Sequence, residues 1–193
     1  MSSFQGKAII VSAPSGAGKT TIVHRLLASG LPLGFSVSAT SRPRRSNEVN
    51  GVDYFFLSPE EFMKRVKNGE FIEWEEVYEN QYYGTLKSEI ERLWQEKKHA
   101  LFDVDVKGGI SLKKYFGSQA LAIFIKPPSL QTLYERLRAR GTETEESLKE
   151  RMAKAEYELS FAPGFDAVVE NNILEKAVEE VYRLVVNFIG AEK

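Results

Sequence analysis

The chain has 193 residues and a formal net charge of −1, and its composition is 42% hydrophobic and 27% charged. These values predict a globular protein with a good core, and the balanced charge gives no support to a general nucleic-acid or membrane-surface binder, which would normally carry a basic excess. The sequence holds no cysteine, which excludes disulfides, thiolate metal sites and a cysteine nucleophile and fits a reducing compartment.

Residues 1–7 are polar and lack the charged-then-apolar pattern of a signal segment, and no apolar run is long enough to span a bilayer. The two histidines, His24 and His99, lie far apart in the sequence, so we do not expect a zinc centre. A cytoplasmic protein is expected, with no membrane, nucleic-acid or obligate protein partner.

The first predicted element is a strand covered on both faces. Lys7 to Ser12 (KAIIVS) is a short apolar, β-branched run, and the apolar residues between Thr20 and Ala28 recur at helical spacing. A glycine-rich turn joins the two segments. Strand, glycine turn and helix in this order predict the start of a βαβ unit.

The turn itself matches the phosphate-loop pattern, except that Ala13 stands where the pattern has its first glycine. A Cβ is tolerated there only if φ is negative. The later glycines let the backbone wrap an anion with its N–H groups pointing inward; Lys19 can reach the β- and γ-phosphates, and the Thr20 hydroxyl can ligate Mg²⁺. A ligand-free glycine turn is the alternative, but a buried strand before it and a helix after it disfavour that. We expect the ATP phosphates to bind to Ala13, Pro14, Ser15, Gly16, Ala17, Gly18, Lys19, Thr20 and Thr21.

From about Phe35 to Leu86 the strand–helix rhythm breaks. Short strand-like pieces, Asp53 to Leu57 and Phe71 to Val77, surround one helix that begins with Ser58 as N-cap and Pro59 at its first position. This segment predicts a compact, strand-rich insertion.

After the insertion, strands and helices alternate again, which predicts a parallel sheet flanked by helices. The strands expected are Ala100 to Val104, Leu121 to Ile125 and Asp166 to Val169; the helices expected are Ser129 to Ala139, Glu145 to Leu159 and Leu174 to Ile189. The segment from Arg136 to Tyr157 is almost all charged helix around a turn at Gly141 to Thr144. It is either a solvated hairpin or a mobile lid over a site.

Several segments of the chain resemble one family, the guanylate kinases. The acceptor-binding region of that family is matched by Phe35 to Arg45 (FSVSATSRPRR), Glu48 to Tyr54, Gly69 to Trp74, Tyr82 to Thr85 and Asp103 to Gly108, and its lid by Arg140 to Glu145. The resemblance runs from about Gly6 to the last helix, with the segments in the family's order. It implies an α/β fold: a three-layer P-loop core with a parallel sheet (residues 1–34 and 98–193), a GMP-binding insertion with a connecting helix (35–97), and a helical lid at about 136–158.

The resemblance also implies an activity. Enzymes of this family transfer the γ-phosphoryl group of ATP to GMP or dGMP, giving ADP and GDP or dGDP, in nucleotide salvage and recycling. The expected substrates are therefore ATP and GMP or dGMP, with Mg²⁺ as the cofactor.

Residue types in the matched segments fit a nucleoside monophosphate. Guanidinium forks suit a dianionic phosphate, and phenols can donate further hydrogen bonds to it, so Arg42, Arg45, Tyr54 and Tyr83 are the candidates. A solvated basic turn and a packed aromatic face are the alternatives. Guanine offers adjacent N1–H and N2–H₂ donors and an O6 acceptor. Its expected partners, by the family match, are the carboxylates Glu73 and Asp105 and the hydroxyls Ser38 and Thr85.

The remaining candidates lie around the triphosphate. Asp103 ends a predicted strand and resembles an acidic residue that lies near Mg²⁺ through water; a structural contact to the phosphate loop is its alternative. Arginines that arrive with lid closure would stabilise the transferring group, so Arg136, Arg140 and Arg151 join Lys19 and Arg42 as catalytic candidates. Asn171 resembles the family's adenine-side residue.

Two other functions compete with this hypothesis. A catalytically inactive scaffold domain of the same architecture would usually lack a working phosphate loop, whereas Lys19, Thr20 and the lid arginines are present here. A kinase for another acceptor, such as a phosphorylated sugar, would leave Glu73 and Asp105 without a guanine to recognise.

Overall fold

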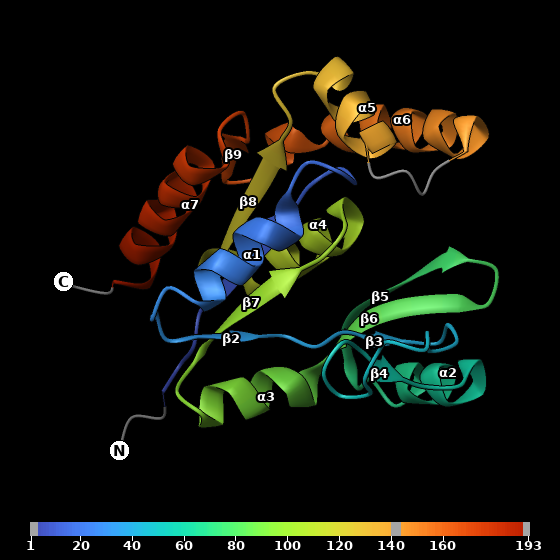
Figure 1. The fold of residues 1–193 in the computed structure, drawn as a ribbon. Helices are drawn as coiled ribbons and strands as arrows, with labels where there is room; N and C mark the ends of the chain where they lie inside the picture. Colours follow the sequence, from blue (N-terminus) through green and yellow to red (C-terminus); the bar gives the residue numbers. More distant parts are fainter. Residues whose placement is uncertain (1–3, 140–143, 191–193) are drawn as a thin grey trace.

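The computed structural model describes residues 4–139 and 144–190, and its centre is a five-stranded parallel sheet with the order β2-β7-β1-β8-β9. Figure 1 shows this sheet with helices on both sides. The parallel sheet predicted from the alternating strands and helices is confirmed. The strands are β1 (Ala8–Ser12), β2 (Leu33–Phe35), β7 (His99–Asp103), β8 (Ala120–Lys126) and β9 (Ala167–Glu170).

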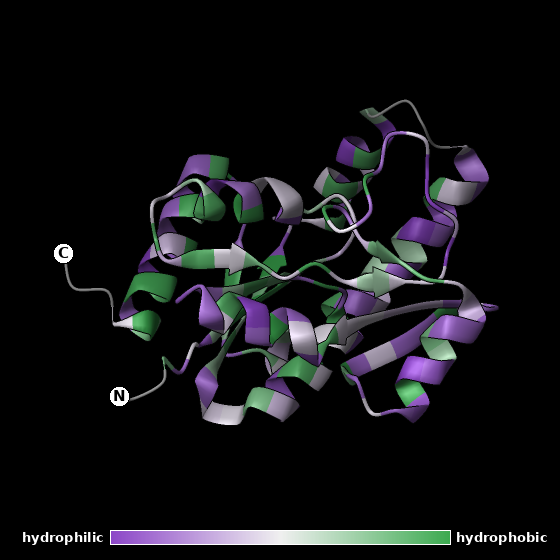
Figure 2. Cartoon of the chain, turned by 90° about the horizontal axis from the view of Figure 1, so that it is seen from below, coloured by the Kyte–Doolittle hydropathy of each residue, from purple (hydrophilic) through white to green (hydrophobic). Residues whose placement is uncertain are grey.

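Alternate residues of β1 belong to two different cores, which explains why its sequence is apolar throughout. Ile9 and Val11 pack with α1 (Lys19–Leu27) and α7 (Leu174–Ile189) on one face of the sheet. Ala8 and Ile10 pack with α3 (Lys87–Gln95) and α4 (Val106–Phe116) on the other face. Helix, sheet and helix thus form three layers. Figure 2 shows the hydrophobic residues gathered on the central strands and on the inward sides of the helices.

A second, four-stranded sheet is built from the segment between β2 and α3, in the order β4-β3-β6-β5. Its strands are β3 (Ala39–Thr40), β4 (Phe55–Phe56), β5 (Phe71–Tyr78) and β6 (Gln81–Leu86), and helix α2 (Pro59–Lys67) covers it. Phe62 of α2 is fully buried and stacks on Phe71 with ring centroids 4.4 Å apart. The Ser58 hydroxyl accepts a hydrogen bond from the Glu61 N–H at 3.1 Å, which confirms the predicted helix start.

Two antiparallel-packed helices, α5 (Leu130–Ala139) and α6 (Glu145–Leu159), form the segment predicted as a hairpin or lid. Leu133 and Leu137 of α5 pack against Leu148 and Ala155 of α6 in a small core of their own. Two short 3₁₀ turns, Gly117–Gln119 and Ala162–Gly164, complete the elements. Among the residues described, no helix has the length and apolar content needed to cross a membrane. The second sheet and the α5–α6 pair lie on the same side of the core in Figure 1.

Candidate active site

The loop between β1 and α1 has the backbone shape that an anion-binding loop needs. Gly16 and Gly18 have φ values of +92° and +94°, which favour glycine. A Cβ at Gly18 would also lie 2.3 Å from Asn171 Nδ2, so glycine is required there for space as well. In the described part of the chain only Asn80 and Lys97 combine a side chain with a positive φ. Ala13 is therefore free of backbone strain, and the departure from the usual first glycine is compatible with the loop.

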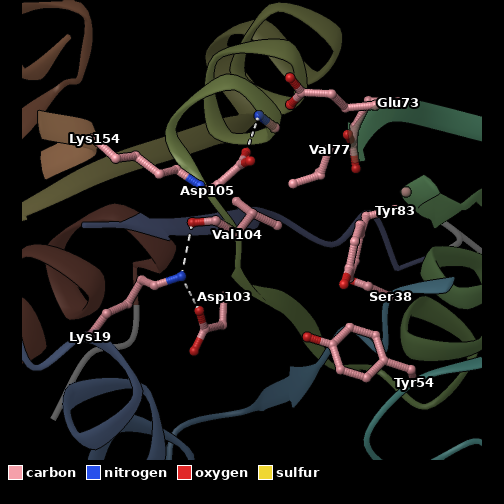
Figure 3. Close-up of a pocket in the computed structure, with 13 residues that line it drawn as sticks. Lys19, Ser38, Tyr54, Glu73, Val77, Tyr83, Asp103, Val104, Asp105 and Lys154 are labelled. Atoms are coloured by element: carbon pink, nitrogen blue, oxygen red, sulfur yellow. Dashed lines mark hydrogen bonds and ion pairs between the residues drawn. The ribbon is translucent and has the colours of Figure 1, made fainter. Parts of the chain in front are cut away.

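Lys19 and Thr20 open α1 and meet the end of β7. Lys19 Nζ forms an ion pair with Asp103 and donates a hydrogen bond to the Val104 carbonyl at 3.0 Å (Figure 3). Thr20 Oγ1 donates to Asp103 Oδ2 at 3.3 Å. An ammonium, a hydroxyl and a carboxylate are thus gathered at the carboxyl end of the central sheet, where ligands of open α/β folds bind.

The side chains of Thr20 and Asp103 fit an Mg²⁺ ion whose other ligands come from a nucleotide and from water. Within the described residues, no group of three or more acidic, His or Cys side chains could hold a metal ion by itself. Thr20 and Asp103 nevertheless offer hard oxygen atoms side by side. That donor set suits Mg²⁺ held mainly by nucleotide oxygens and water.

A cavity of about 270 Å³ lies between the central sheet and the second sheet. Figure 3 shows Lys19 and Lys154 on one side of it and Ser38, Tyr54, Glu73 and Tyr83 on the other. Its lining consists of Lys19, Ser38, Tyr54, Glu73, Glu75, Val77, Tyr83, Gly84, Asp103, Val104, Asp105, Gly108 and Lys154. The cavity therefore brings Lys19 and Asp103 together with most of the predicted acceptor-binding residues.

Glu73 faces this cavity because of the alternation along β5. Glu73, Glu75 and Val77 are partly buried and line it, whereas the residues between them are exposed. The pKa of Glu73 is raised to about 7, and burial is the largest cause. The nearby Asp105 and Glu75 carboxylates also raise this pKa, whereas the hydrogen bond from Thr85 lowers it. Thr85 is itself buried, and its hydroxyl donates to Glu73 Oε1 at 2.7 Å. In this structure the Thr85 hydroxyl thus acts on Glu73, although we expected it to face the base.

Asp105 has two roles in the structure, of which the sequence predicted only the binding role. Its side chain caps α4 by accepting the Gly108 N–H at 2.8 Å, and it also lines the cavity. A helix N-terminus carries a partial positive charge, so the cap holds the carboxylate in place.

The two predicted phosphate-binding arginines differ in their surroundings. The Arg42 guanidinium is held by Glu48 through hydrogen bonds of 2.8 and 2.6 Å and lies 5.0 Å from the centroid of the Tyr54 ring. The Tyr54 and Tyr83 rings are 6.0 Å apart. The side chain of Arg45 is exposed, and its backbone N–H donates to Glu48 at 2.8 Å.

Helices α5 and α6 contact the phosphate loop and the segment after β9. Arg151 of α6 donates to Ser15 Oγ at 2.9 Å, and Arg136 of α5 donates to the backbone carbonyl of Asn171 at 3.0 Å. Asn171 is buried, and its Nδ2 donates to the Ala17 carbonyl at 2.8 Å, so it stabilises the backbone of the phosphate loop. Arg140, the remaining lid candidate, lies outside the described residues.

The structure adds two residues of α6 to the site that no local motif singles out. Lys154 and Glu158, four residues apart on α6, line the pocket of the phosphate loop with their charged groups 3.8 Å apart. Burial raises the pKa of Glu158. Their spacing on one helical face is the only sign of this pair in the sequence.

Comparison with known proteins decides the family. The family model for guanylate kinase matches residues 5–187. The chain belongs to the guanylate kinase family. It is 53% identical to a guanylate kinase of Bacteroides fragilis, over 97% of this chain and 92% of that one, and 53% identical to a guanylate kinase of Porphyromonas gingivalis, over 95% and 98%.

A solved structure supports the same family assignment. The crystal structure of guanylate kinase from Anaplasma phagocytophilum superposes with a TM-score of 0.76 at 27% identity, covering 96% of this chain and 87% of that one. The family resemblance expected from the sequence is therefore confirmed, and so is its fold.

Proposed function

We propose that this protein is a guanylate kinase in activity as well as in family, and that it transfers the γ-phosphoryl group of ATP to GMP or dGMP. The observation that carries the proposal is the shared cleft: Lys19 of the phosphate loop lines the same cavity as Glu73 and Asp105. Donor and acceptor phosphates would meet there, close to Lys19. Free nucleotides in the cytoplasm would be its substrates.

In the proposed reaction an oxygen of the GMP phosphate attacks the γ-phosphorus of ATP. The bond from that phosphorus to the β–γ bridging oxygen breaks, and ADP leaves. The protein supplies positioning and charge neutralisation rather than covalent chemistry. Lys19 neutralises charge between the β- and γ-phosphates, and the loop of residues 13–21 binds the phosphates through its backbone N–H groups, which all of its residues except Pro14 possess.

The acceptor would be held at both ends. Arg42, Arg45, Tyr54 and Tyr83 bind its phosphate, while Glu73, Asp105 and Ser38 read the guanine, with Thr85 orienting Glu73. Arg136, Arg140 and Arg151 act on the transferring group from the lid, and Asn171 lies on the adenine side. Thr20, with Asp103 near it, would hold Mg²⁺, which would supply further neutralisation of the phosphate charge.

A coupled assay of ADP release with ATP and Mg²⁺ tests the function across GMP, AMP, CMP and UMP. The proposal expects release with GMP far above the other three. Folded protein that releases no ADP with GMP would contradict it and favour the scaffold alternative, and preference for another acceptor would favour a different kinase.

A further inference from the structure

Glu48 gathers the hydrogen-bond donors of the turn that carries the phosphate-binding arginines. Its Oε1 accepts from Arg42 NH2 at 2.6 Å, and its Oε2 accepts from Arg42 NH1 and from the Arg45 backbone N–H, both at 2.8 Å. Arg44 NH1 donates to the Glu48 backbone carbonyl at 3.1 Å. Four donor groups of one short turn, from residues 42, 44 and 45, therefore converge on Glu48.

The Arg42–Glu48 pair is nearly withdrawn from solvent, with side chains only 10% and 11% exposed. The hydrogen bonds from Arg42 and from the Arg45 backbone hold the pKa of Glu48 at about 2, so the carboxylate stays ionised at any ordinary pH. A fork of two parallel hydrogen bonds fixes the plane of a guanidinium as well as its distance. Arg42 is thus set in one orientation before any ligand arrives.

The orientation of Arg42 leaves two of its N–H donors directed away from both Glu48 and Pro43. A guanidinium has five N–H donors. Glu48 takes one proton of NH1 and one of NH2, and the Pro43 carbonyl takes the other NH1 proton at 3.0 Å. The Nε–H and the second NH2 proton form the other fork. In the described part of the chain that fork meets no carboxylate or carbonyl, and Tyr54 and Tyr83, which line the cavity, lie beside the same guanidinium.

We propose that Glu48 is a positioning residue that presents the second fork of Arg42, the one beside the Tyr54 and Tyr83 hydroxyls, to the phosphate of the acceptor nucleotide. This inference rests on the proposed function, in which Arg42 binds that phosphate. Glu48 need not leave when the acceptor binds, because the two anions use different forks of one guanidinium. In the opposite role, Glu48 would occupy the place of the phosphate and would have to be displaced by it. Removing the charge of Glu48 would then tighten GMP binding instead of weakening it.

Equilibrium titration of GMP and of guanosine into the full-length protein tests this role. Guanosine carries the same base and sugar without the phosphate, so the ratio of the two affinities isolates the phosphate contacts. Glu48→Gln keeps the shape of the side chain and removes its charge. We expect this variant to lower the GMP-to-guanosine affinity ratio by about 10-fold to 100-fold, the range for a weakened charge-assisted hydrogen bond, with guanosine affinity unchanged. Steady-state kinetics should show a raised KM for GMP and an unchanged KM for ATP.

Glu61→Gln is the matched control, because Glu61 forms a similar pair with Arg65 Nε at 3.0 Å on α2, outside the cavity. It should leave the ratio unchanged. Glu48→Asp, which keeps the charge, should restore part of the ratio and also serves if Glu48→Gln does not fold. An unchanged ratio, tighter GMP binding, or an equal loss for GMP and guanosine would each overturn the inference. Because binding is measured without turnover, wild-type protein that binds GMP but releases no ADP would contradict the proposed function alone.

Discussion

At Glu73, burial and the proposed recognition of the base act against each other. Burial raises its pKa to about 7, whereas the N1–H and N2–H₂ groups of guanine need an ionised acceptor. Below that pH the free enzyme holds more of Glu73 protonated, and binding GMP requires the loss of that proton. As the pH rises through about 7, the carboxylate form, which is competent to bind the base, becomes dominant.

The pH profile of kcat/KM for GMP measures this titration, because kcat/KM reports ionisations of the free enzyme. We expect it to rise with pH and to level off above about 7. In Glu73→Gln the rise through this range should be absent, at a lower plateau. The Thr85 hydrogen bond lowers the pKa of Glu73, so Thr85→Val should move the midpoint to higher pH. Identical profiles for wild type and Glu73→Gln would show that another group controls the rise.

For single residues, the sequence predicted which side chains belong to the site better than it predicted the hydrogen bonds between them. Lys19, Thr20 and Glu73 could be named because glycine spacing and the family resemblance are readable along the chain. The bond from Thr85 to Glu73 joins residues 12 apart on two strands, and its direction depends on the register of β5 with β6. The pair of Arg42 with Glu48 depends on how a turn closes. Neither arrangement has a local sequence signal.

At the scale of an element, α4 begins at a residue that also belongs to the site. Asp105 caps the helix through the Gly108 N–H while it lines the cavity. Asn caps helices about as well as Asp, whereas Ala does not and costs about 0.5–2 kcal/mol. Substitutions at Asp105 can therefore separate stability from recognition.

We expect Asp105→Asn to keep the free energy of unfolding near that of the wild type and to lower kcat/KM for GMP. Asp105→Ala should lower both, with the stability loss in the range given for a missing cap. Denaturant unfolding and steady-state kinetics on the two variants check this. If Asp105→Asn has wild-type kcat/KM, the charge of Asp105 takes no part in recognition.

The phosphate loop offers a second test at this scale. Gly18→Ala places a side chain at φ +94° and 2.3 Å from Asn171 Nδ2, so it should strain the backbone and push Asn171 off the Ala17 carbonyl. Gly30→Ala has a similar strain at φ +80°, but its Cβ meets nothing within 4 Å. Both variants should lose roughly 1–2 kcal/mol of stability from the left-handed conformation.

Only Gly18→Ala should weaken ATP binding, because only Gly18 lies in the loop. Titration with a non-hydrolysable ATP analogue, alongside thermal unfolding, separates the two effects. Equal ATP affinity in the two variants would contradict the assignment of residues 13–21 to the triphosphate.

Helices could be located from the sequence more closely than short strands. α6 and α7 have the predicted bounds, because the apolar spacing that predicts a helix is local. β4, two residues long, is shorter than the strand-like piece predicted at Asp53 to Leu57, and β3, which pairs with β4 and β6, had no prediction. β2 also had no prediction: Phe35, assigned to the insertion, ends this strand and pairs with Leu101 of the central sheet.

At the scale of the whole molecule, one cavity is lined by residues of both the central sheet and the second sheet. Lys19 and Asp103 come from the central layers, Glu73 and Thr85 come from the second sheet, and Arg151 of α6 donates a hydrogen bond to Ser15. A reaction between two phosphates needs all three parts at one place and water excluded from it. The alternating pattern of strands and helices predicts the central layers, but only the structure shows the cavity that joins them.

The central claim is that this cavity recognises the guanine base and so selects GMP for phosphorylation beside the phosphate loop. Adenine has a lone pair at N1 instead of a donor, lacks the 2-amino group, and carries a donor where guanine has O6. A site built on such hydrogen bonds can reject the wrong base by about 10⁴.

The most direct measurement is kcat/KM for GMP and for AMP, in the wild type and in Glu73→Gln. We expect strong preference for GMP in the wild type, and a loss of about 10-fold to 10³-fold in kcat/KM for GMP in the variant, with ATP binding nearly unchanged. The GMP-to-AMP ratio should fall accordingly. A ratio that is the same in the wild type and in Glu73→Gln would contradict the account, because Glu73 would then not read the base.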